Sequence, residues 1–434
     1  MENKRPTWGI SKTKTDQVWS QLSIKGKGAV VAGQDTGYEW EHAAIKDQYR
    51  GWNGSSADHN YNWWDAIHAT GSSCGKDSQE PCDDSEHGTH TMGTMVGNDN
   101  NGTSIGMAPE AKWIGCRNMN ANNGTVTTYV ECFQFFLAPT NLKKQAADPT
   151  KAPHVINNSW VCPTSEGCNS STFGTIEKVV NNLRSAGVVV VGSAGNDYQS
   201  VGCSSVREPV AMFKSTFTVG STTSGDAASS FSNRGPVSNY GGHISPDISA
   251  PGSGVYSCIP GGGYKNMDGT SMAGPHVAGL VALLVSANPG LSGKVSEIEN
   301  IIQSTAVKLY SSTCGSGANA IPNNTFGYGR IDALAAVKKA ISLVSVMENE
   351  KSKAVATTYP NPFSSVISFG LKNWNAETTL EIYTVTGELV FSKTWEVVPE
   401  KYDVELQNQA SGAYFYRIAN HAQHVNGKLF KVND

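Results

Sequence analysis

Three segments of the chain carry residue types that together can perform nucleophilic catalysis. Asp35 follows an apolar run, His87 opens a His-Gly-Thr-His stretch, and Ser271 lies in Gly-Thr-Ser-Met-Ala. A serine hydroxyl is a weak nucleophile until a neighbouring imidazole takes its proton. The imidazole needs a carboxylate that fixes its tautomer and stabilises its charged form. These residue types therefore predict acyl transfer through a serine nucleophile.

A fourth segment supplies a donor for the oxyanion of such a reaction. Asn196 closes the stretch Ser-Ala-Gly-Asn, which follows the apolar run at residues 188–192. A carboxamide there can donate a hydrogen bond to a tetrahedral oxyanion, and removing such a donor typically costs about 10²–10³ in rate. The backbone N–H of Ser271, at the start of an expected helix, is the second candidate donor.

Each segment also has a structural interpretation when it is taken alone. Asp35 could cap backbone N–H groups at a strand-to-turn junction, and Ser271 could be a helix N-cap. We expect His90 and His276 to be structural, because the chemistry needs one proton carrier. The four segments in this order favour the catalytic interpretation.

Apolar runs and helical segments alternate from about Gly28 to Leu343. Unbroken apolar runs bounded by turn residues are typical of strands buried on both faces of a parallel sheet. Strands are expected at residues 29–33, 112–115, 154–157 and 188–192, and helices at residues 126–137, 175–186, 271–287 and 295–305. The pattern predicts an α/β doubly wound domain, whose loops at the carboxyl ends of the strands meet in a crevice.

The composition changes near residue 345. Residues 346–357 are rich in Glu, Lys, Ala and Thr without an apolar period, which predicts a solvated linker. Short alternating segments then predict a small C-terminal all-β sandwich of six or seven strands. The expected domains are therefore residues 1–345 and 358–434, joined by the linker 346–357.

Composition excludes several functional classes. With 33 basic and 37 acidic side chains among 434 residues, the chain has no basic field for nucleic acid. Its 38% apolar content is enough for a core and excludes global disorder. The longest apolar stretches, such as Val277–Val285, are shorter than the ~20 residues of a membrane span. We expect neither a nucleic-acid partner nor a membrane span.

Cysteine spacing indicates an oxidising compartment. Nine cysteines include no C-x-x-C pair, so structural zinc is not expected, and short loops between cysteines suit an exported protein. We expect local disulfides Cys74–Cys82 and Cys162–Cys168, and at least one unpaired thiol. Cys116 and Cys132 are also close in the sequence. The first residues lack an apolar segment, so we expect a longer precursor from which a signal peptide was removed.

The motifs around Asp35, His87 and Ser271, and their order, resemble those of the subtilisin-like serine proteases. The resemblance runs from about Trp8 to Ala340 and is greatest to the bacillopeptidase F group. That closer likeness rests on Trp8-Gly-Ile, Asn157-Asn-Ser-Trp160, Ser193-Ala-Gly-Asn196 and Gly269–Gly279. It implies a seven-stranded parallel sheet flanked by helices.

The resemblance implies a role for each matched position. Asp35 would orient His87, His87 would act as general base and then acid, Ser271 as nucleophile, and Asn196 in the oxyanion hole. A protein or peptide substrate would add as a strand beside residues 118–124 and 159–162. The implied substrate-binding residues are Ser159, Trp160, Ser193, Ala194 and Gly195. The family usually has Gly where this chain has Val161, so the subsites are expected to differ.

The resemblance implies that the chemistry requires no cofactor and that structural calcium can be bound. Asp77, Glu80, Asp83 and Asp84 form an acidic loop without a fixed-spacing calcium motif, so we expect a solvated loop and assign no metal ligand. Relatives carry an N-terminal propeptide, so we also expect the precursor to include one. This form alone is then expected to refold poorly.

The C-terminal segment resembles the sorting domains of the type IX secretion system of Bacteroidetes. The likeness rests on Tyr359-Pro-Asn-Pro-Phe, Ile382-Tyr-Thr-Val-Thr-Gly387, Ser411-Gly-Ala-Tyr414-Phe and Gly427-Lys-Leu-Phe-Lys. It implies secretion machinery as a partner and a secreted or cell-surface bacterial protein, which we expect to be a monomer.

We therefore expect a secreted serine endopeptidase that hydrolyses peptide bonds through an acyl-enzyme on Ser271. The alternative from another class is a catalytically silent binding or adhesion protein exported by its sorting domain. Such a protein would be expected to lack one of the four site residues, and this chain has all of them. An esterase or ligase with the same triad is a narrower alternative.

Overall fold

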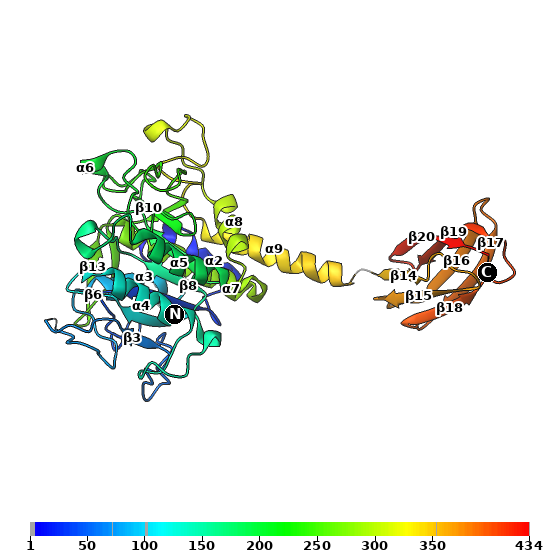
Figure 1. Ribbon diagram of the computed structural model, residues 1–434, viewed down its shortest axis with the longest axis horizontal. Helices are drawn as coiled ribbons and strands as arrows, with labels where there is room; N and C mark the ends of the chain where they lie inside the picture. The colour runs from blue at the N-terminus through cyan, green and yellow to red at the C-terminus, as the bar shows by residue number, and fades with distance from the viewer. Residues whose placement is uncertain (1–4, 72, 100–102, 353, 434) are drawn as a thin grey trace. The chain divides into compact units, whose positions relative to one another are not determined.

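The computed structural model describes residues 5–71, 73–99, 103–352 and 354–433 (Figure 1). The chain divides into two compact units, residues 1–342 and 343–434, each of which is described by itself.

A seven-stranded parallel sheet forms the centre of the first unit, in the order β11-β10-β9-β8-β2-β5-β3. Its strands are β2 (Val30–Asp35), β3 (Trp63–Asp65), β5 (Lys112–Arg117), β8 (Val155–Asn158), β9 (Val189–Ser193), β10 (Phe217–Thr222) and β11 (Ile248–Pro251). The α/β doubly wound fold is confirmed, and four of these strands were expected from their apolar runs.

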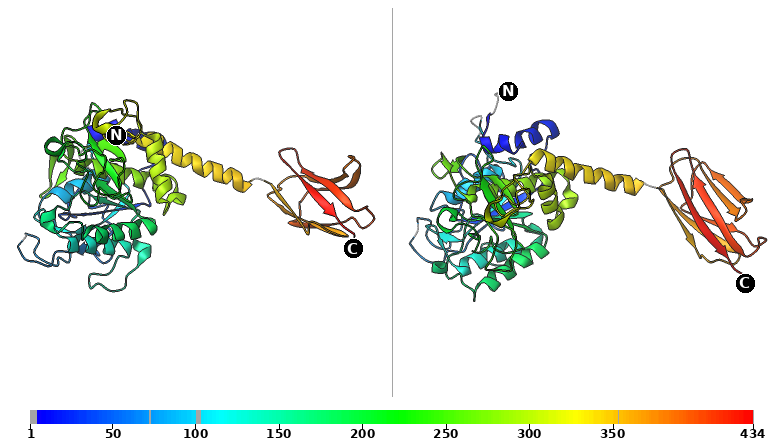
Figure 2. Two further views of the ribbon diagram at one scale, coloured as in Figure 1. Left: turned by 45° about the horizontal axis from the view of Figure 1, so that its top comes forward. Right: turned by 90° about the horizontal axis from the view of Figure 1, so that it is seen from above.

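Helices cover both faces of this sheet (Figures 1 and 2). They include α3 (His87–Val96), α4 (Val126–Leu137), α5 (Phe173–Ser185), α7 (Thr270–Ala287) and α8 (Val295–Thr305). Ala32 lies opposite Ile114 and Ile156 in the register, and all three belong to the core that contains α4 and α5. Because side chains alternate along a strand, their neighbours face the other side, where α3 and α7 contact each other and the sheet.

Helix α7 is the one helix among the described residues that is long and apolar enough to span a membrane. Most of it, 83%, is buried inside the protein, because it packs against β2, β8, β9, β10 and β11. Its apolar character is therefore that of a central core helix.

Short elements complete the first unit. They are β1 (Arg5–Pro6), α1 (Trp8–Lys12), α2 (Thr15–Leu22), β4 (Thr103–Ser104), β6 (Met119–Asn120), β7 (Asn123–Gly124), α6 (Tyr198–Val201), β12 (Val255–Ile259) and β13 (Gly263–Met267), with the 3₁₀ turns η1 (Pro149–Lys151), η2 (Thr164–Glu166), η3 (Pro289–Leu291) and η4 (Thr313–Gly315). Trp63 and Trp64 are buried in strand β3 at the edge of the central sheet.

The expected linker is mostly regular structure. Helix α9 (Ala333–Ser352) extends into residues 346–357, and strand β14 (Val355–Tyr359) begins within them. Ala, Glu and Lys are strong helix formers even without an apolar period, which accounts for the helical part of this segment. That residues 346–357 form a solvated linker between two domains stays a prediction.

The second unit contains two antiparallel sheets, β14-β15-β18 and β17-β16-β19-β20. Their further strands are β15 (Val366–Lys372), β16 (Thr378–Thr384), β17 (Leu389–Trp395), β18 (Lys401–Glu405), β19 (Gly412–Ala419) and β20 (His424–Lys431). Phe369, Leu380 and Tyr416 belong to its separate core. This is the small all-β region that the alternating segments predicted.

Four disulfides link the described part of the chain. The expected pairs Cys74–Cys82 and Cys162–Cys168 are confirmed. The other two are Cys116–Cys132 and Cys203–Cys314. Cys258 is the remaining thiol, and it is buried.

Candidate active site

The candidate site lies where the order of the sheet reverses. Strand β2 pairs with β5 on one side and with β8 on the other, and the chain crosses from one side to the other between them. Loops that leave the carboxyl ends of parallel strands at such a point enclose a crevice. Asp35 ends β2, Ser159 follows β8, and Asn196 lies three residues beyond β9.

Asp35 and His87 form a hydrogen-bonded pair. The buried Oδ1 of Asp35 accepts from Nδ1 of His87 at 2.7 Å and from the backbone N–H of Thr36 at 2.8 Å. His87 opens α3, and its side chain is 26% exposed. The bond to Asp35 holds the proton on Nδ1 and leaves Nε2 as an acceptor.

The pKa of His87 is raised above its ordinary value of 6.5. Burial acts to lower this pKa, but the charge and hydrogen bond of Asp35 outweigh burial, and the charge of Asp83 adds to them. The folded protein therefore favours the imidazolium at this position, which is the form a general base reaches after it takes a proton.

Asp83 supports this pair, a role that its place in an acidic loop did not predict. One of its carboxylate oxygens accepts from Thr36 Oγ1 (2.7 Å) and from the backbone N–H of Ser85 (3.0 Å). The other accepts from the backbone N–H (2.8 Å) and Oγ1 (2.7 Å) of Thr89 in the first turn of α3. The N-cap residue Glu86 makes no side-chain capping bond, so Asp83 performs the capping of the helix that begins at His87.

Ser271 is the second residue of α7. Its Oγ donates to the carbonyl oxygen of Ser159 at 3.0 Å, and Ser159 Oγ donates to the carbonyl oxygen of Ser271 at 2.9 Å. Within the described residues, no hydrogen bond joins Ser271 Oγ to His87. Transfer of a proton from this hydroxyl to His87 would require the hydroxyl to turn away from Ser159, and catalytic hydrogen bonds often tighten only when substrate binds.

The carboxamide of Asn196 is oriented by Thr270. Its Oδ1 accepts from the backbone N–H of Thr270 at 2.9 Å and from Thr270 Oγ1 at 3.0 Å. With the oxygen held against the start of α7, the amide nitrogen is directed away from Thr270 and is free to donate. The first backbone N–H groups of a helix lack partners within the helix, so that of Ser271 is a second donor at the same place.

Several residues that were predicted to bind substrate have buried side chains. Ser193, Ala194 and Trp160 are 3%, 2% and 5% exposed. Ser193 Oγ donates to the carbonyl oxygen of Thr270 at 2.9 Å, which fixes the start of α7. The Trp160 ring stacks on Tyr129, with ring centroids 3.8 Å apart. Any contact of Trp160 or Ser193 with substrate would therefore use the backbone.

Two carboxylates of the acidic loop are bound by the protein itself. Asp83 is bound by Thr36, Ser85 and Thr89, and the side chain of Asp84 is 2% exposed beside Arg117. The expectation of a solvated loop is wrong for these two residues, because their carboxylates serve as acceptors for the protein itself. Among the described residues, no group of three or more His, Cys, Asp and Glu side chains is arranged to hold a metal. Structural calcium remains a prediction.

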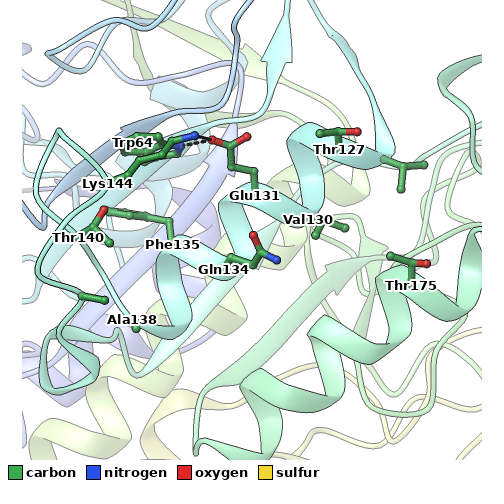
Figure 3. Close-up of a pocket in the computed structure, with 12 residues that line it drawn as sticks. Trp64, Thr127, Val130, Glu131, Gln134, Phe135, Ala138, Thr140, Lys144 and Thr175 are labelled. Atoms are coloured by element: carbon green, nitrogen blue, oxygen red, sulfur yellow. Dashed lines mark hydrogen bonds and ion pairs between the residues drawn. The ribbon is translucent and has the colours of Figure 1, made fainter.

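A separate hollow of about 580 Å³ lies along α4 (Figure 3). Lys144 Nζ lies over the ring of Trp64 and pairs with Glu131 at 2.8 Å on its wall. The lining includes none of the four predicted catalytic residues, so this hollow is distinct from the crevice.

The two additional histidines are buried. His90 Nε2 bonds to the carbonyl oxygens of Val255 and Lys265, and His276 Nδ1 bonds to the carbonyl oxygen of Met272. Burial lowers the pKa of each to about 4, so both are neutral at neutral pH. Their contacts are those of structural residues.

Comparison with known proteins bears on both units. Residues 26–329 match the subtilase family, and residues 357–432 match a secretion system C-terminal sorting domain. Bacillopeptidase F of Bacillus subtilis (strain 168) is 38% identical over 352 residues, which are 80% of this chain and 23% of that protein. A thermophilic serine proteinase of Bacillus sp. (strain AK1) is 32% identical over 76% of this chain and 66% of its own length. Subtilisin Savinase of Lederbergia lenta is 32% identical over 59% of this chain and 79% of its own length.

Proposed function

The chain belongs to the subtilase family, and we propose that it is a serine endopeptidase that hydrolyses peptide bonds in proteins through an acyl-enzyme on Ser271. Its C-terminal sorting domain directs it to the exterior or the surface of the cell. The chain spans about a quarter of the length of bacillopeptidase F.

The first half of the reaction forms the acyl-enzyme. Ser271 Oγ attacks the carbonyl carbon of the scissile peptide bond while Nε2 of His87 takes its proton, and Asp35 stabilises the imidazolium. The oxyanion accepts hydrogen bonds from the amide nitrogen of Asn196 and the backbone N–H of Ser271. His87 then gives the proton to the leaving amine as the C–N bond breaks.

The second half returns the enzyme. Water takes the place of the amine, loses a proton to His87 and attacks the acyl carbon. The ester bond to Ser271 breaks, and His87 returns the proton to Ser271 Oγ. Every proton that His87 accepts is passed on, so no cofactor is needed for the balance.

The observation that carries this proposal is the orientation of the Asn196 carboxamide. Thr270 fixes the oxygen of Asn196 with two hydrogen bonds, and this leaves the amide nitrogen as a donor beside Gly269, which precedes α7 and lies two residues before Ser271. A side chain that only capped the helix would need just the oxygen that accepts from Thr270, and it would not need a free amide donor. A free donor beside a helix N-terminus instead favours a developing negative charge.

We further propose that the substrate backbone lies as a strand between hairpin β6–β7 and the segment that follows β8. The hairpin is a two-stranded sheet, so its outer edge has backbone groups without a neighbouring strand. Ser159 lies at the start of the second segment and contacts Ser271 directly. A strand added there would present its carbonyl groups to the nucleophile. We expect the enzyme to act as a monomer.

The proposal is tested by the time course of peptide ester hydrolysis. We expect a burst of leaving group equal to the enzyme concentration, followed by slower turnover, because deacylation limits ester hydrolysis by an acyl-enzyme. Ser271→Ala should abolish the burst while the protein stays folded. Equal turnover by the wild type and Ser271→Ala would refute the proposal.

A further inference from the structure

One backbone donor on the edge of hairpin β6–β7 is directed away from the hairpin. Gly124 lies opposite Met119, and the two turn residues between the strands, Ala121 and Asn122, have φ of 46° and 70°. Positive φ at both positions is the mark of a two-residue type I′ turn. In such a hairpin the pair next to the turn exchanges hydrogen bonds, so the following pair does not. The N–H of Gly124 therefore points to the free edge.

That donor is already occupied by a side chain. The backbone N–H of Gly124 donates to Oε1 of Glu166 at 3.1 Å. The other carboxylate oxygen of Glu166 accepts from Tyr129 Oη at 2.6 Å. Glu166 thus presents an acceptor to the edge of β7 at the place where the carbonyl group of an added strand would lie.

The residues around Glu166 hold it in this position. Glu166 lies in the short loop closed by the disulfide Cys162–Cys168, and both cysteines are at most 2% exposed. The ring of Tyr129 is stacked on Trp160, which directly follows Ser159. Glu166 is therefore joined to the segment that contacts Ser271 by the disulfide loop and by its hydrogen bond from Tyr129, whose ring stacks on Trp160.

We propose that Glu166 ends the substrate-binding edge on the acyl side of the scissile bond. Its carboxylate takes the hydrogen bond from the N–H of Gly124 that a carbonyl group of a substrate strand would otherwise accept. Peptide residues beyond that point therefore form no backbone hydrogen bonds with the hairpin. The enzyme then selects its substrates by a short stretch next to the cleaved bond. This inference rests on the proposed function, because it requires a peptide bound as a strand beside the hairpin.

The test uses two peptide anilides with the same leaving group and the same two residues before the scissile bond. The longer peptide carries three further residues on the acyl side. For the wild type, we expect kcat/KM for the long peptide to exceed that for the short one by less than about threefold. Glu166→Ala frees the N–H of Gly124, and one recovered hydrogen bond should raise this ratio by about two- to tenfold. The gain should appear in KM, because Gly124 is remote from the reacting atoms.

Three further variants separate the effect of the Glu166–Gly124 contact from general effects of mutation on activity. Glu166→Gln keeps an oxygen acceptor for Gly124, so its ratio should stay near that of the wild type. Tyr129→Phe removes one of the two bonds that hold Glu166 and should raise the ratio, by less than Glu166→Ala does. Glu177→Ala is the matched control, because Glu177 on α5 likewise accepts from a tyrosine hydroxyl, Tyr240 Oη at 2.5 Å, and makes no hydrogen bond to hairpin β6–β7 within the part of the chain that the structure describes. Its ratio should equal that of the wild type.

Two results overturn the inference. One is a wild-type ratio above about tenfold, which would mean that long peptides already use this edge. The other is an unchanged ratio in both Glu166→Ala and Tyr129→Phe while the short peptide is still cleaved. Fluorophosphonate labelling of Ser271 distinguishes failure of the proposed function. If Ser271 is unlabelled and neither peptide is cleaved, both proposals fall; if it is labelled and the ratios do not change, only this inference falls.

Discussion

Asp83→Asn should weaken the protein and shift its activity to lower pH at the same time. The carboxylate accepts four hydrogen bonds, from Thr36 Oγ1, from Ser85 N–H, and from both the N–H and Oγ1 of Thr89. In asparagine, one oxygen can keep two of these donors, but the NH₂ group then faces the backbone N–H of Thr89. The variant loses a helix cap worth about 1 kcal/mol and leaves a donor without an acceptor, at about 1–3 kcal/mol.

These contributions sum to about 3 kcal/mol of unfolding free energy. With an unfolding entropy of about 2.1 cal/mol/K per residue, the 342 residues of the first unit give about 0.7 kcal/mol/K. The expected decrease in Tm is therefore about 4 °C. Calorimetry of the wild type and the variant at one pH measures this decrease.

The second effect follows from the pKa of His87. The charge of Asp83 is one of the causes that raise this pKa, so its removal should lower the pKa. A base with a lower pKa remains unprotonated at lower pH, so the acid limb of the kcat/KM profile should move to lower pH. Asp84→Asn is the matched control: it removes a neighbouring charge that is not among the causes of the His87 shift, so its acid limb should not move. An acid limb that stays in place or moves to higher pH in Asp83→Asn would refute this reasoning.

Three further perturbations have expected outcomes. Asn196→Ala should lower kcat by about 10²–10³ with little change in KM in steady-state kinetics, because the donor acts mainly on the oxyanion; a loss confined to KM would contradict this role. Burial raises the pKa of Asp247 from 3.8 to about 7, so wild-type stability should fall as pH rises from about 4 to 7, and urea unfolding should show that Asp247→Asn stabilises by about 4 kcal/mol more at pH 8 than at pH 4. An equal effect at both pH values would count against that ionisation. Replacing both Cys203 and Cys314 with serine opens a disulfide that spans 111 residues and should cost about 4–5 kcal/mol by loop entropy, whereas a loss under about 1 kcal/mol in the same assay would show that the loop is held by other contacts.

The sequence predicted those parts of the fold that depend on local pattern. Helices α4 and α8 begin and end where their apolar periods do, at residues 126–137 and 295–305. His87 and Ser271 open helices because their motifs carry small residues that lead into apolar stretches. Strand β3 was not predicted, because it has only three residues, too few for an apolar pattern to distinguish a strand from a loop.

The features that depend on long-range contact were not predictable in this way. Asp83 was placed in an acidic loop, because the sequence does not show that the donors of Thr36 and Thr89 converge on its carboxylate. The Cys203–Cys314 disulfide has no local spacing signal. Glu166 has no motif around it, and its contact with Gly124 depends on how a disulfide loop meets a hairpin. Such contacts are set by tertiary packing and only weakly by the local sequence.

The most direct test of the central claim is reaction with a fluorophosphonate probe, followed by mass spectrometry of the labelled peptide. We expect the folded wild type to be labelled at Ser271 alone, and Ser271→Ala to remain unlabelled. The labelling rate should fall at acidic pH as His87 becomes protonated, because the serine then loses its base. Folded wild-type protein that is not labelled at Ser271 would contradict the account and would favour a silent binding protein.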